Sequence, residues 1–199
     1  MKERGFLVPQ HEAKALQEGR QTQFRRIIKP QPPSWAEKGT INQFGRWDFG
    51  GRSATRHQIS CGYVCPYGQA GDRLWVREAF IDTNSEWNVP VIYKADGTIP
   101  FPGWKWRPSV HMTRGESRFT REITNIRVER VRDISEEDAI VEGVRRVFFQ
   151  GVPWFYHTES GGPSFETAIE AYAALWGSIH GEGVWARDDW TWVLSTLLL

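Results

Sequence analysis

Sulfur, net charge and long apolar runs are all scarce in this 199-residue chain. Its two cysteines, Cys61 and Cys65, are too few for the disulfide framework of a small secreted protein. The formal net charge is only +1, so any nucleic-acid binding has to come from local basic patches. No stretch approaches the roughly 18 apolar residues of a membrane span, and the N-terminus lacks a signal-peptide core. We therefore expect a soluble, cytoplasmic protein that does not bind membranes.

The common signatures of catalysis and metal binding are also missing. There is no glycine-rich phosphate loop, nucleophile elbow or HExxH helix. His57, Cys61 and Cys65 recur at every fourth position, but a structural zinc takes four ligands from closer pairs. Nothing in the spacing requires His111 as a fourth ligand. We therefore predict no metal and no cofactor, and we interpret the two thiols as structural.

Tryptophan, in contrast, is abundant, with eleven residues. An indole ring supplies a large apolar area for a core and a flat face on which a nucleobase can stack. Exposing all eleven rings would make the surface adhesive, so we expect most of them in the core. Trp75 and Trp104 are the candidates for stacking against a base.

The densest local charge lies in segment 19–30, Gly-Arg-Gln-Thr-Gln-Phe-Arg-Arg-Ile-Ile-Lys-Pro, which contains no acid. A short helical pattern over 9–18 precedes it, and Gly19 stands where a helix end favours a positive φ. The segment itself is expected to be extended and holds four cations: Arg20, Arg25, Arg26 and Lys29. Guanidinium groups bind phosphate oxygens bidentately, which favours a nucleotide or nucleic-acid ligand. The alternative is a basic edge strand that is solvated or paired with the protein's own carboxylates.

Alternating polar and apolar residues predict short strands at 73–80, 91–95, 117–131 and 190–194. In the third of these the alternation changes phase between Ile123 and Ile126, which indicates a β-bulge or a break. Helical signals are fewer. Ser135 is a good N-cap for a helix that Gly143 ends, and Ser164 is expected to cap another helix.

Two stretches show no sustained period. We interpret 31–60 as an irregular insertion or hairpin, and 148–162 as an irregular aromatic loop. Short strands with few helices, spread along the chain, indicate a single α+β domain built around a small β-barrel.

Glu142 falls in the last turn of the helix that begins at Ser135. The partial negative charge at a helix C-terminus disfavours a carboxylate by some tenths of a kcal/mol. A solvated Glu142 would lose little, whereas a buried one would need a nearby cation. On local grounds alone, a solvated Glu142 is favoured.

Several motifs follow one another in a fixed order along the chain. They are Gly19-Arg20-x-Thr22-x-x-Arg25-Arg26-x-x-Lys29-Pro30, Tyr67-Gly68-x-x-Gly71-Asp72-x-Leu74-Trp75-Val76-Arg77-Glu78, Arg107-Pro108-Ser109-x-His111-Met112, Ile126-Arg127-Val128-Glu129-Arg130, Asp133-Ile134-Ser135-x-x-Asp138-Ala139-x-x-Glu142-Gly143, Leu175-Trp176-x-Ser178-Ile179 and Trp190-x-Trp192-Val193. The series resembles the ASCH-domain proteins encoded by tailed phages and prophages, and only 31–60 and 148–162 fall outside it. The resemblance implies a PUA-like β-barrel with helices packed across it, and a cleft that accepts RNA or a modified nucleoside.

One bacterial branch of that family consists of amidohydrolases that remove the acetyl group from N4-acetylcytidine with a Lys, a Thr and a Glu. Carried over by position, the Glu is Glu142, but Gln21 stands at the Lys position and Phe24 at the Thr position. Gln does not exchange a proton near neutral pH, and Phe has no hydroxyl. Thr22 would share a face with position 24 in an extended segment, as a displaced hydroxyl. The resemblance thus implies a degenerate catalytic set.

These observations leave three functions open. In the preferred one, the domain binds RNA or a modified nucleoside without turning it over. The candidate binding residues are Arg20, Gln21, Thr22, Phe24, Arg25, Arg26, Lys29, Trp75, Arg77 and Trp104. In the second, the protein is an amidohydrolase or ribonuclease with Glu142 as its general acid or base. In the third, it is a phage accessory protein whose aromatic loops bind a host or virion protein.

Overall fold

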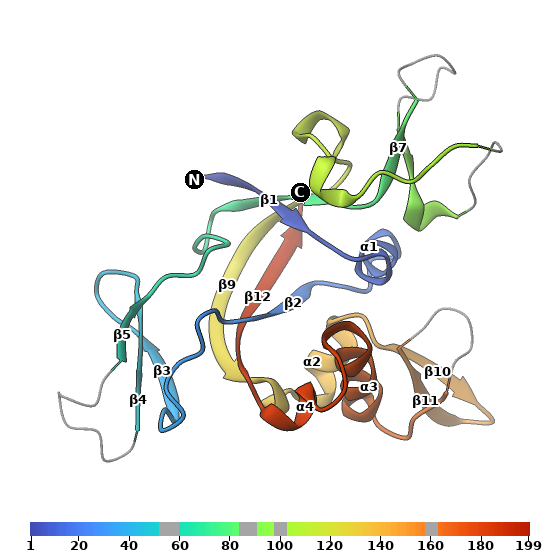
Figure 1. Cartoon of the computed structure of the whole chain (residues 1–199). Helices are drawn as coiled ribbons and strands as arrows, with labels where there is room; N and C mark the ends of the chain where they lie inside the picture. The colour runs from blue at the N-terminus through green and yellow to red at the C-terminus, as the bar shows by residue number, and fades with distance from the viewer. Residues whose placement is uncertain (52–59, 84–90, 98–102, 158–162) are drawn as a thin grey trace.

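The computed structural model describes residues 1–51, 60–83, 91–97, 103–157 and 163–199. The main sheet consists of β1 (Glu3–Leu7), β2 (Gln23–Ile27), β6 (Arg73–Arg77), β9 (Thr120–Arg130) and β12 (Trp190–Leu198). Their order is β1-β6-β9-β12-β2, with β1 parallel to β6 and the other neighbours antiparallel (Figure 1). The sheet and the helices beside it confirm the α+β prediction.

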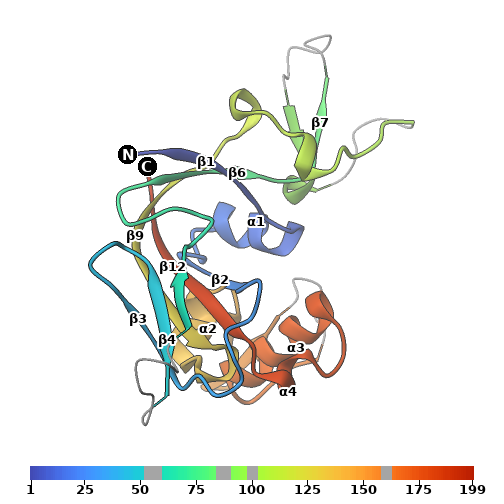
Figure 2. The same ribbon diagram turned by 60° about the vertical axis from the view of Figure 1, so that its left-hand side comes forward.

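The main sheet is strongly curved because β9 bends across it (Figures 1 and 2). Ser195 pairs with Asn125 but Thr196 pairs with Ile123, so Thr124 is an extra residue on β9. One extra residue increases the local twist and bends its strand. The predicted bulge between Ile123 and Ile126 is therefore confirmed. The pairing among the described strands ends at β1 and β2 and does not close the sheet.

The N-terminal helix and the basic segment have the predicted form. Helix α1 spans Gln10–Gln17 and buries Ala13 and Leu16. Gly19 then adopts a φ of +69°, and the chain continues into β2. The start of β2 is tied to a distant helix, since the Thr22 N–H donates to the Val141 carbonyl at 3.0 Å.

Helix α2 spans Glu136–Val141, and its Ser135 cap is confirmed because Ser135 Oγ accepts the Asp138 N–H at 3.1 Å. Helix α3 spans Ala168–His180. Its cap is Thr167, so the prediction of Ser164 is wrong. Phe165 forms a backbone bridge with Phe155, so the helix begins only after this residue. Helix α4 spans Val184–Arg187.

The two stretches without a sustained period contain regular structure. Strands β3 (Lys38–Ile41) and β4 (Trp47–Gly50) form a hairpin, to which β5 (Ser60–Tyr63) adds a third strand. The hairpin interpretation of 31–60 therefore holds for 38–50. Strands β10 (Arg145–Phe149) and β11 (Val152–Tyr156) form a second hairpin.

The second hairpin makes the interpretation of 148–162 as irregular wrong up to residue 156. Its turn, Gln150 and Gly151, has positive φ values of 51° and 82°, which match the twist of a two-residue hairpin. The remaining pair, β7 (Phe80–Asp82) and β8 (Val91–Tyr93), is followed by a 3-10 turn at Lys94–Asp96. Further 3-10 turns span Ser109–His111, Arg114–Glu116 and Val131–Asp133.

Two hydrophobic cores meet at β2. The first packs against the concave sheet and contains Phe6, Phe24 and Trp192. The second lies among α2, α3, α4 and β11 and contains Tyr172 and Trp176. Because β2 lies between them, its polar side chains are buried at the junction of the two cores.

Fewer tryptophans are fully buried than expected. Four are buried (Trp47, Trp176, Trp190, Trp192), five are half-buried (Trp75, Trp104, Trp106, Trp154, Trp185), Trp35 is exposed, and Trp87 lies outside the described residues. Among the helices that the structure describes, none has the length and apolar character needed to cross a bilayer.

Candidate functional site

Glu142 is the C-cap residue of α2, and it is only 3% exposed. Its Oε1 accepts hydrogen bonds from Gln23 Nε2 at 2.8 Å and from Arg25 Nε at 3.1 Å. Its Oε2 accepts the Tyr172 hydroxyl at 2.6 Å. Burial raises the pKa of Glu142, and the Arg25 charge and these hydrogen bonds oppose the rise. The cation expected beside a buried Glu142 is therefore Arg25.

Arg25 is enclosed by the protein's own acids. Besides Glu142, its guanidinium donates to Glu129 Oε2 at 3.1 Å and lies 3.9 Å from Asp138. Arg127 extends the cluster by pairing with both Glu129 and Asp138. Burial alone would lower the pKa of Arg25, but the Glu142, Tyr172 and Glu129 charges raise it overall. Arg25 therefore fits the alternative derived from the sequence, pairing with internal carboxylates.

Arg26 and Arg20 are also held internally. Arg26 donates to both carboxylate oxygens of Glu12, at 2.8 and 2.6 Å, and its guanidinium lies 4.7 Å from the centre of the Phe6 ring. Arg20 pairs with Glu18 at 2.6 Å and donates to the Gly143 carbonyl at 2.8 Å. The three arginines thus brace the ends of α1 and α2 against β2.

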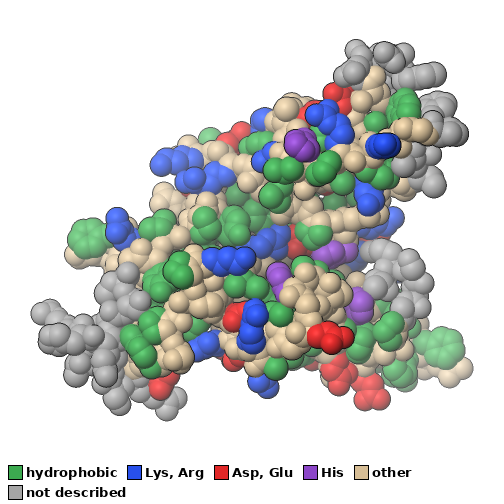
Figure 3. Space-filling view, viewed as in Figure 1, with side chains coloured by type: hydrophobic (Ala, Val, Ile, Leu, Met, Phe, Trp, Pro, Cys, Tyr) green, Lys and Arg blue, Asp and Glu red, His purple; other side chains and the backbone are tan. Residues whose placement is uncertain are grey.

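A cavity of about 230 Å³, here called the inner cavity, lies beside Glu142 among α1, β2 and α3. Its lining consists of Leu7, Pro9, His11, Glu12, Gln21, Arg25, Arg26, Glu142, Tyr172, Leu175, Trp176, Ile179 and His180. Glu142 and the basic segment therefore meet at one hollow. Figure 3 shows basic and histidine side chains gathered beside a hollow that crosses this face.

Two buried polar atoms of the inner cavity have no partner among the described residues: Gln21 Oε1 and Trp176 Nε1. Both side chains are 2% exposed. Gln21 Nε2 donates to the Gln23 carbonyl at 3.1 Å, which fixes the amide orientation and leaves Oε1 as the unpaired atom. Two residues that line the cavity therefore each carry a polar atom without a partner among the described residues.

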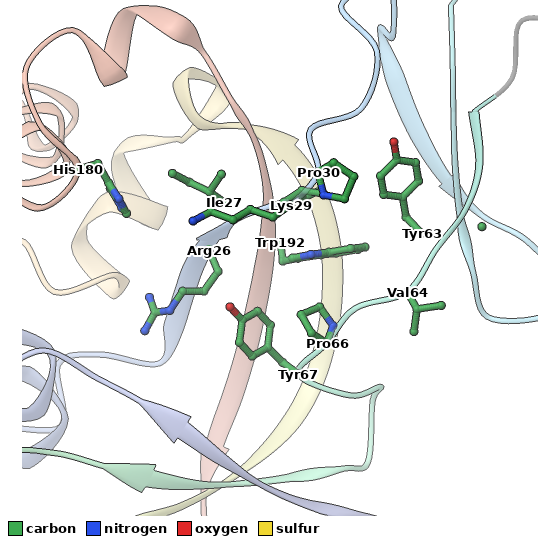
Figure 4. Close-up of a pocket in the computed structure, with 12 residues that line it drawn as sticks. Arg26, Ile27, Lys29, Pro30, Tyr63, Val64, Pro66, Tyr67, His180 and Trp192 are labelled. Atoms are coloured by element: carbon green, nitrogen blue, oxygen red, sulfur yellow. The ribbon is translucent and has the colours of Figure 1, made fainter. Parts of the chain in front are cut away.

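A larger cavity of about 650 Å³, here called the outer cavity, shares lining residues with the inner one, and Figure 4 shows the outer lining. It is lined by Arg26, Ile27, Ile28, Lys29, Pro30, Gly62, Tyr63, Val64, Pro66, Tyr67, His180 and Trp192. Arg26 and His180 line both cavities. Burial lowers the pKa of His180, and the Arg26 and Lys29 charges lower it further.

Five other predicted residues are not among those that line the two cavities. Phe24 is completely buried, with its ring centre 4.9 Å from that of Phe6, and Thr22 is exposed. Trp75 and Arg77 stack on each other on β6, 5.1 Å from guanidinium carbon to ring centre. Trp104 is half-buried in the segment that follows residue 102. None of these five residues lines the inner or the outer cavity.

Sequence reasoning missed the contribution of α3. Tyr172, Trp176 and His180 lie four residues apart, so they share one face of the helix, and all three line the inner cavity. Tyr172 and Trp176 also belong to the second core. The available signal was the polar tip that each of these side chains carries on an otherwise apolar face.

The sulfur and histidine residues considered for a metal do not assemble in the described part of the chain. Cys65 is buried, and burial raises the pKa of its thiol to about 11, which makes it unreactive. His57 and the side chain of Cys61 lie outside the described residues. Among the described residues, no group of three metal-ligating side chains is present.

The site as a whole is a cavity with a buried carboxylate at its wall. Its lining residues carry an unpaired acceptor, an unpaired donor and the enclosed carboxylate, whereas the described residues that line it include no Ser, Thr, Cys or Lys. Comparisons of this chain with protein-family models, with curated proteins and with solved structures find no match.

Proposed function

We propose that this chain is an ASCH-like domain of PUA-like architecture that binds a nucleoside, free or within RNA, in the inner cavity and does not turn it over. The motif series over nearly the whole chain supports this assignment. Further support comes from the curved, bulged sheet and from the meeting of Glu142 with segment 20–26 at one cavity.

The observation that carries the proposal is the pair of unpartnered atoms, Gln21 Oε1 and Trp176 Nε1. Buried polar groups are nearly always hydrogen-bonded, so an unpaired donor and an unpaired acceptor on two residues that line one cavity favour a ligand that pairs with both once it is seated there. A nucleobase edge presents donors and acceptors side by side, and so does an acylated exocyclic amine. The cavity volume of about 230 Å³ lies below the ~300–1,000 Å³ typical of drug-sized ligands, so it suits one base.

Binding is favoured over turnover because the catalytic partners are missing. Gln21 lies in the cavity but does not exchange a proton, and Phe24 is packed in the core. Glu142 already accepts three hydrogen bonds from the protein. One observation favours the hydrolase alternative: a buried carboxyl with a raised pKa in a cavity is typical of acid–base sites.

The test is a calorimetric titration of the purified chain with adenosine, cytidine, guanosine, uridine and N4-acetylcytidine. We expect saturable one-to-one binding of at least one nucleoside. Trp176→Phe removes the indole donor and keeps a ring, so it should weaken binding about tenfold, the effect of one buried hydrogen bond. Trp75→Phe, outside both cavities, is the matched control and should bind normally.

Two results would contradict the proposal. Absence of binding by all five nucleosides would exclude a nucleoside site, and unchanged affinity in Trp176→Phe would exclude the inner cavity. The same samples are analysed for product by chromatography. Turnover of N4-acetylcytidine that disappears in Glu142→Gln would establish the hydrolase instead.

A further inference from the structure

The outer cavity differs from the inner one in the charge of its lining. Arg26, Lys29 and His180 line the outer cavity, and no Asp or Glu is among its described lining residues. In the inner cavity, Glu12 and Glu142 balance Arg25 and Arg26. An anionic group is therefore better accommodated in the outer cavity, and an uncharged group in the inner one.

Lys29 is the side chain best placed to receive that anion. It is exposed, and its ammonium has no acidic partner within the part of the chain that the structure describes. Arg26, in contrast, is held in place by Glu12. In Figure 4, Lys29 extends towards the side of the cavity where Arg26, His180 and the Tyr67 hydroxyl lie.

The opposite side of the outer cavity consists of flat apolar groups: Pro30, Tyr63, Pro66 and Trp192 (Figure 4). Two of these rings contact core rings, and Trp192 is itself a core residue that is only 2% exposed. The ring centre of Tyr63 lies 5.0 Å from that of Phe49, and the ring centre of Trp192 lies 6.1 Å from that of Trp47. The accessible stacking surface is therefore Tyr63 with Pro30 and Pro66, and a ring that is already ordered, as Tyr63 is by Phe49, loses little entropy when a base stacks on it.

The two cavities adjoin at Arg26 and His180. A chain that left the inner cavity would therefore meet the cationic side of the outer cavity first and the aromatic side next. This is the order of base, phosphate and neighbouring base in a single strand. The outer volume of about 650 Å³ is large enough for a nucleotide-sized group.

We infer that the outer cavity is the subsite for a second nucleotide, whose linking phosphate lies at Lys29 and whose base lies against the aromatic and proline side. The ligand is then a single-stranded RNA segment of at least two nucleotides. The inference rests on the proposed function, because it extends a ligand whose first base lies in the inner cavity. An aromatic and proline groove also suits a proline-rich peptide, but the Lys29 ammonium, in a described lining without Asp or Glu, favours phosphate.

The experiment compares the four ribonucleosides with their 3′- and 5′-monophosphates and with the four homodinucleotides, by calorimetry at two salt concentrations. For the base that binds, we expect the dinucleotide to bind about tenfold more tightly than the nucleoside, as one stacked base and one phosphate contact provide. The two monophosphates show on which side of the nucleoside the phosphate lies.

Two variants test which part of the outer cavity causes the tighter binding of the dinucleotide. Lys29→Gln should remove most of the tenfold gain and lower the salt dependence, while binding of the nucleoside alone stays unchanged. Val64→Asp places a carboxylate at an exposed position of the outer lining, where Val64 is 60% exposed, and should have the same effect. Lys38→Gln, an exposed lysine of β3 outside both cavities, is the matched control.

The outcomes separate this inference from the proposed function. Equal affinity for nucleoside and dinucleotide, or a gain that survives Lys29→Gln, would overturn the second subsite and leave the nucleoside site intact. Absence of binding by every compound would overturn both. Binding of a proline-rich peptide that dinucleotides do not displace would assign the outer cavity to a protein partner and overturn the inference.

Discussion

Glu142 Oε1 and Arg25 Nε lie 3.1 Å apart, although 117 positions separate the two residues in the sequence. The pair joins the end of α2 to the middle of β2 at the junction of the two cores. Both side chains are almost fully enclosed, with 2% and 0% of their side-chain area exposed. The contact therefore fixes one wall of the inner cavity and accounts for an acid at a helix C-terminus.

The Glu142–Arg25 pair should respond asymmetrically to substitution. Arg25→Met leaves the Glu142 carboxylate buried without its cation, which should destabilise the fold by about 3–5 kcal/mol. Glu142→Gln keeps the shape and leaves Arg25 with Glu129 and Asp138, so it should cost about 1–3 kcal/mol. Urea denaturation of both variants and of the double variant measures these differences.

The double variant provides the control for that comparison. We expect it to lose less stability than the sum of the two single losses, by about 0.5–3 kcal/mol of coupling. Strict additivity would show that the two groups do not interact in solution.

Glu142 should also affect how stability depends on pH. Its folded pKa is raised by burial, so the folded state holds the proton at a pH where the unfolded chain has released it. The stabilisation is present below the unfolded pKa of about 4.5 and is lost as pH rises through the folded pKa. The stability difference between wild type and Glu142→Gln should therefore move against the wild type as pH rises from 4.5. A difference that is constant with pH would contradict the raised pKa.

His180 should affect the pH dependence of stability in the direction opposite to Glu142. Burial, together with the Arg26 and Lys29 charges, lowers its folded pKa below the ordinary value of 6.5. Its contribution is present above pH 6.5 and is lost as pH falls through the folded pKa, because protonation then favours unfolding. His180→Gln should make the free energy of unfolding less dependent on pH in this range.

Chemical denaturation of wild type and His180→Gln at pH 7.5 and pH 5.5, about one unit either side of 6.5, measures this effect. His111, an exposed side chain outside both cavities, supplies the matched substitution His111→Gln, which should keep the wild-type loss. An equal loss in His180→Gln and wild type would show that His180 does not contribute.

Position 19 should require glycine because of its positive φ, and not because a side chain would clash with neighbouring atoms. Its φ is +69°, and a Cβ built there meets nothing within 4 Å. Gly19→Ala should therefore cost about 1 kcal/mol through backbone strain alone. Gly115 also has open space but no positive φ, so Gly115→Ala should stay within about 0.5 kcal/mol of wild type. If the two substitutions lower the melting temperature equally, the positive φ of Gly19 is not the cause of the loss.

Part of the candidate site could be predicted from the sequence. Glu142 stands out by its place at a helix end, where an acid is unfavourable, its candidate role follows from the resemblance, and the structure brings it to segment 20–26. Gln21 is predicted to contact a ligand, and the structure places it in the lining of the inner cavity. The polar tips of Tyr172 and Trp176 signal that each side chain needs a polar partner, but their helical spacing does not show that they lie beside a cavity.

The sequence by itself determined the local features, because each follows from interactions among near neighbours. The positive φ of Gly19, the Ser135 cap and the bulge near Thr124 all belong to this group. Only the tertiary structure decided what the arginines of segment 20–30 bind. Arg25 pairs with Glu129 and Glu142, which lie more than a hundred positions away, and such pairings arise when the two cores meet at β2. A count of charges along the chain carries no information on which acids are brought within reach.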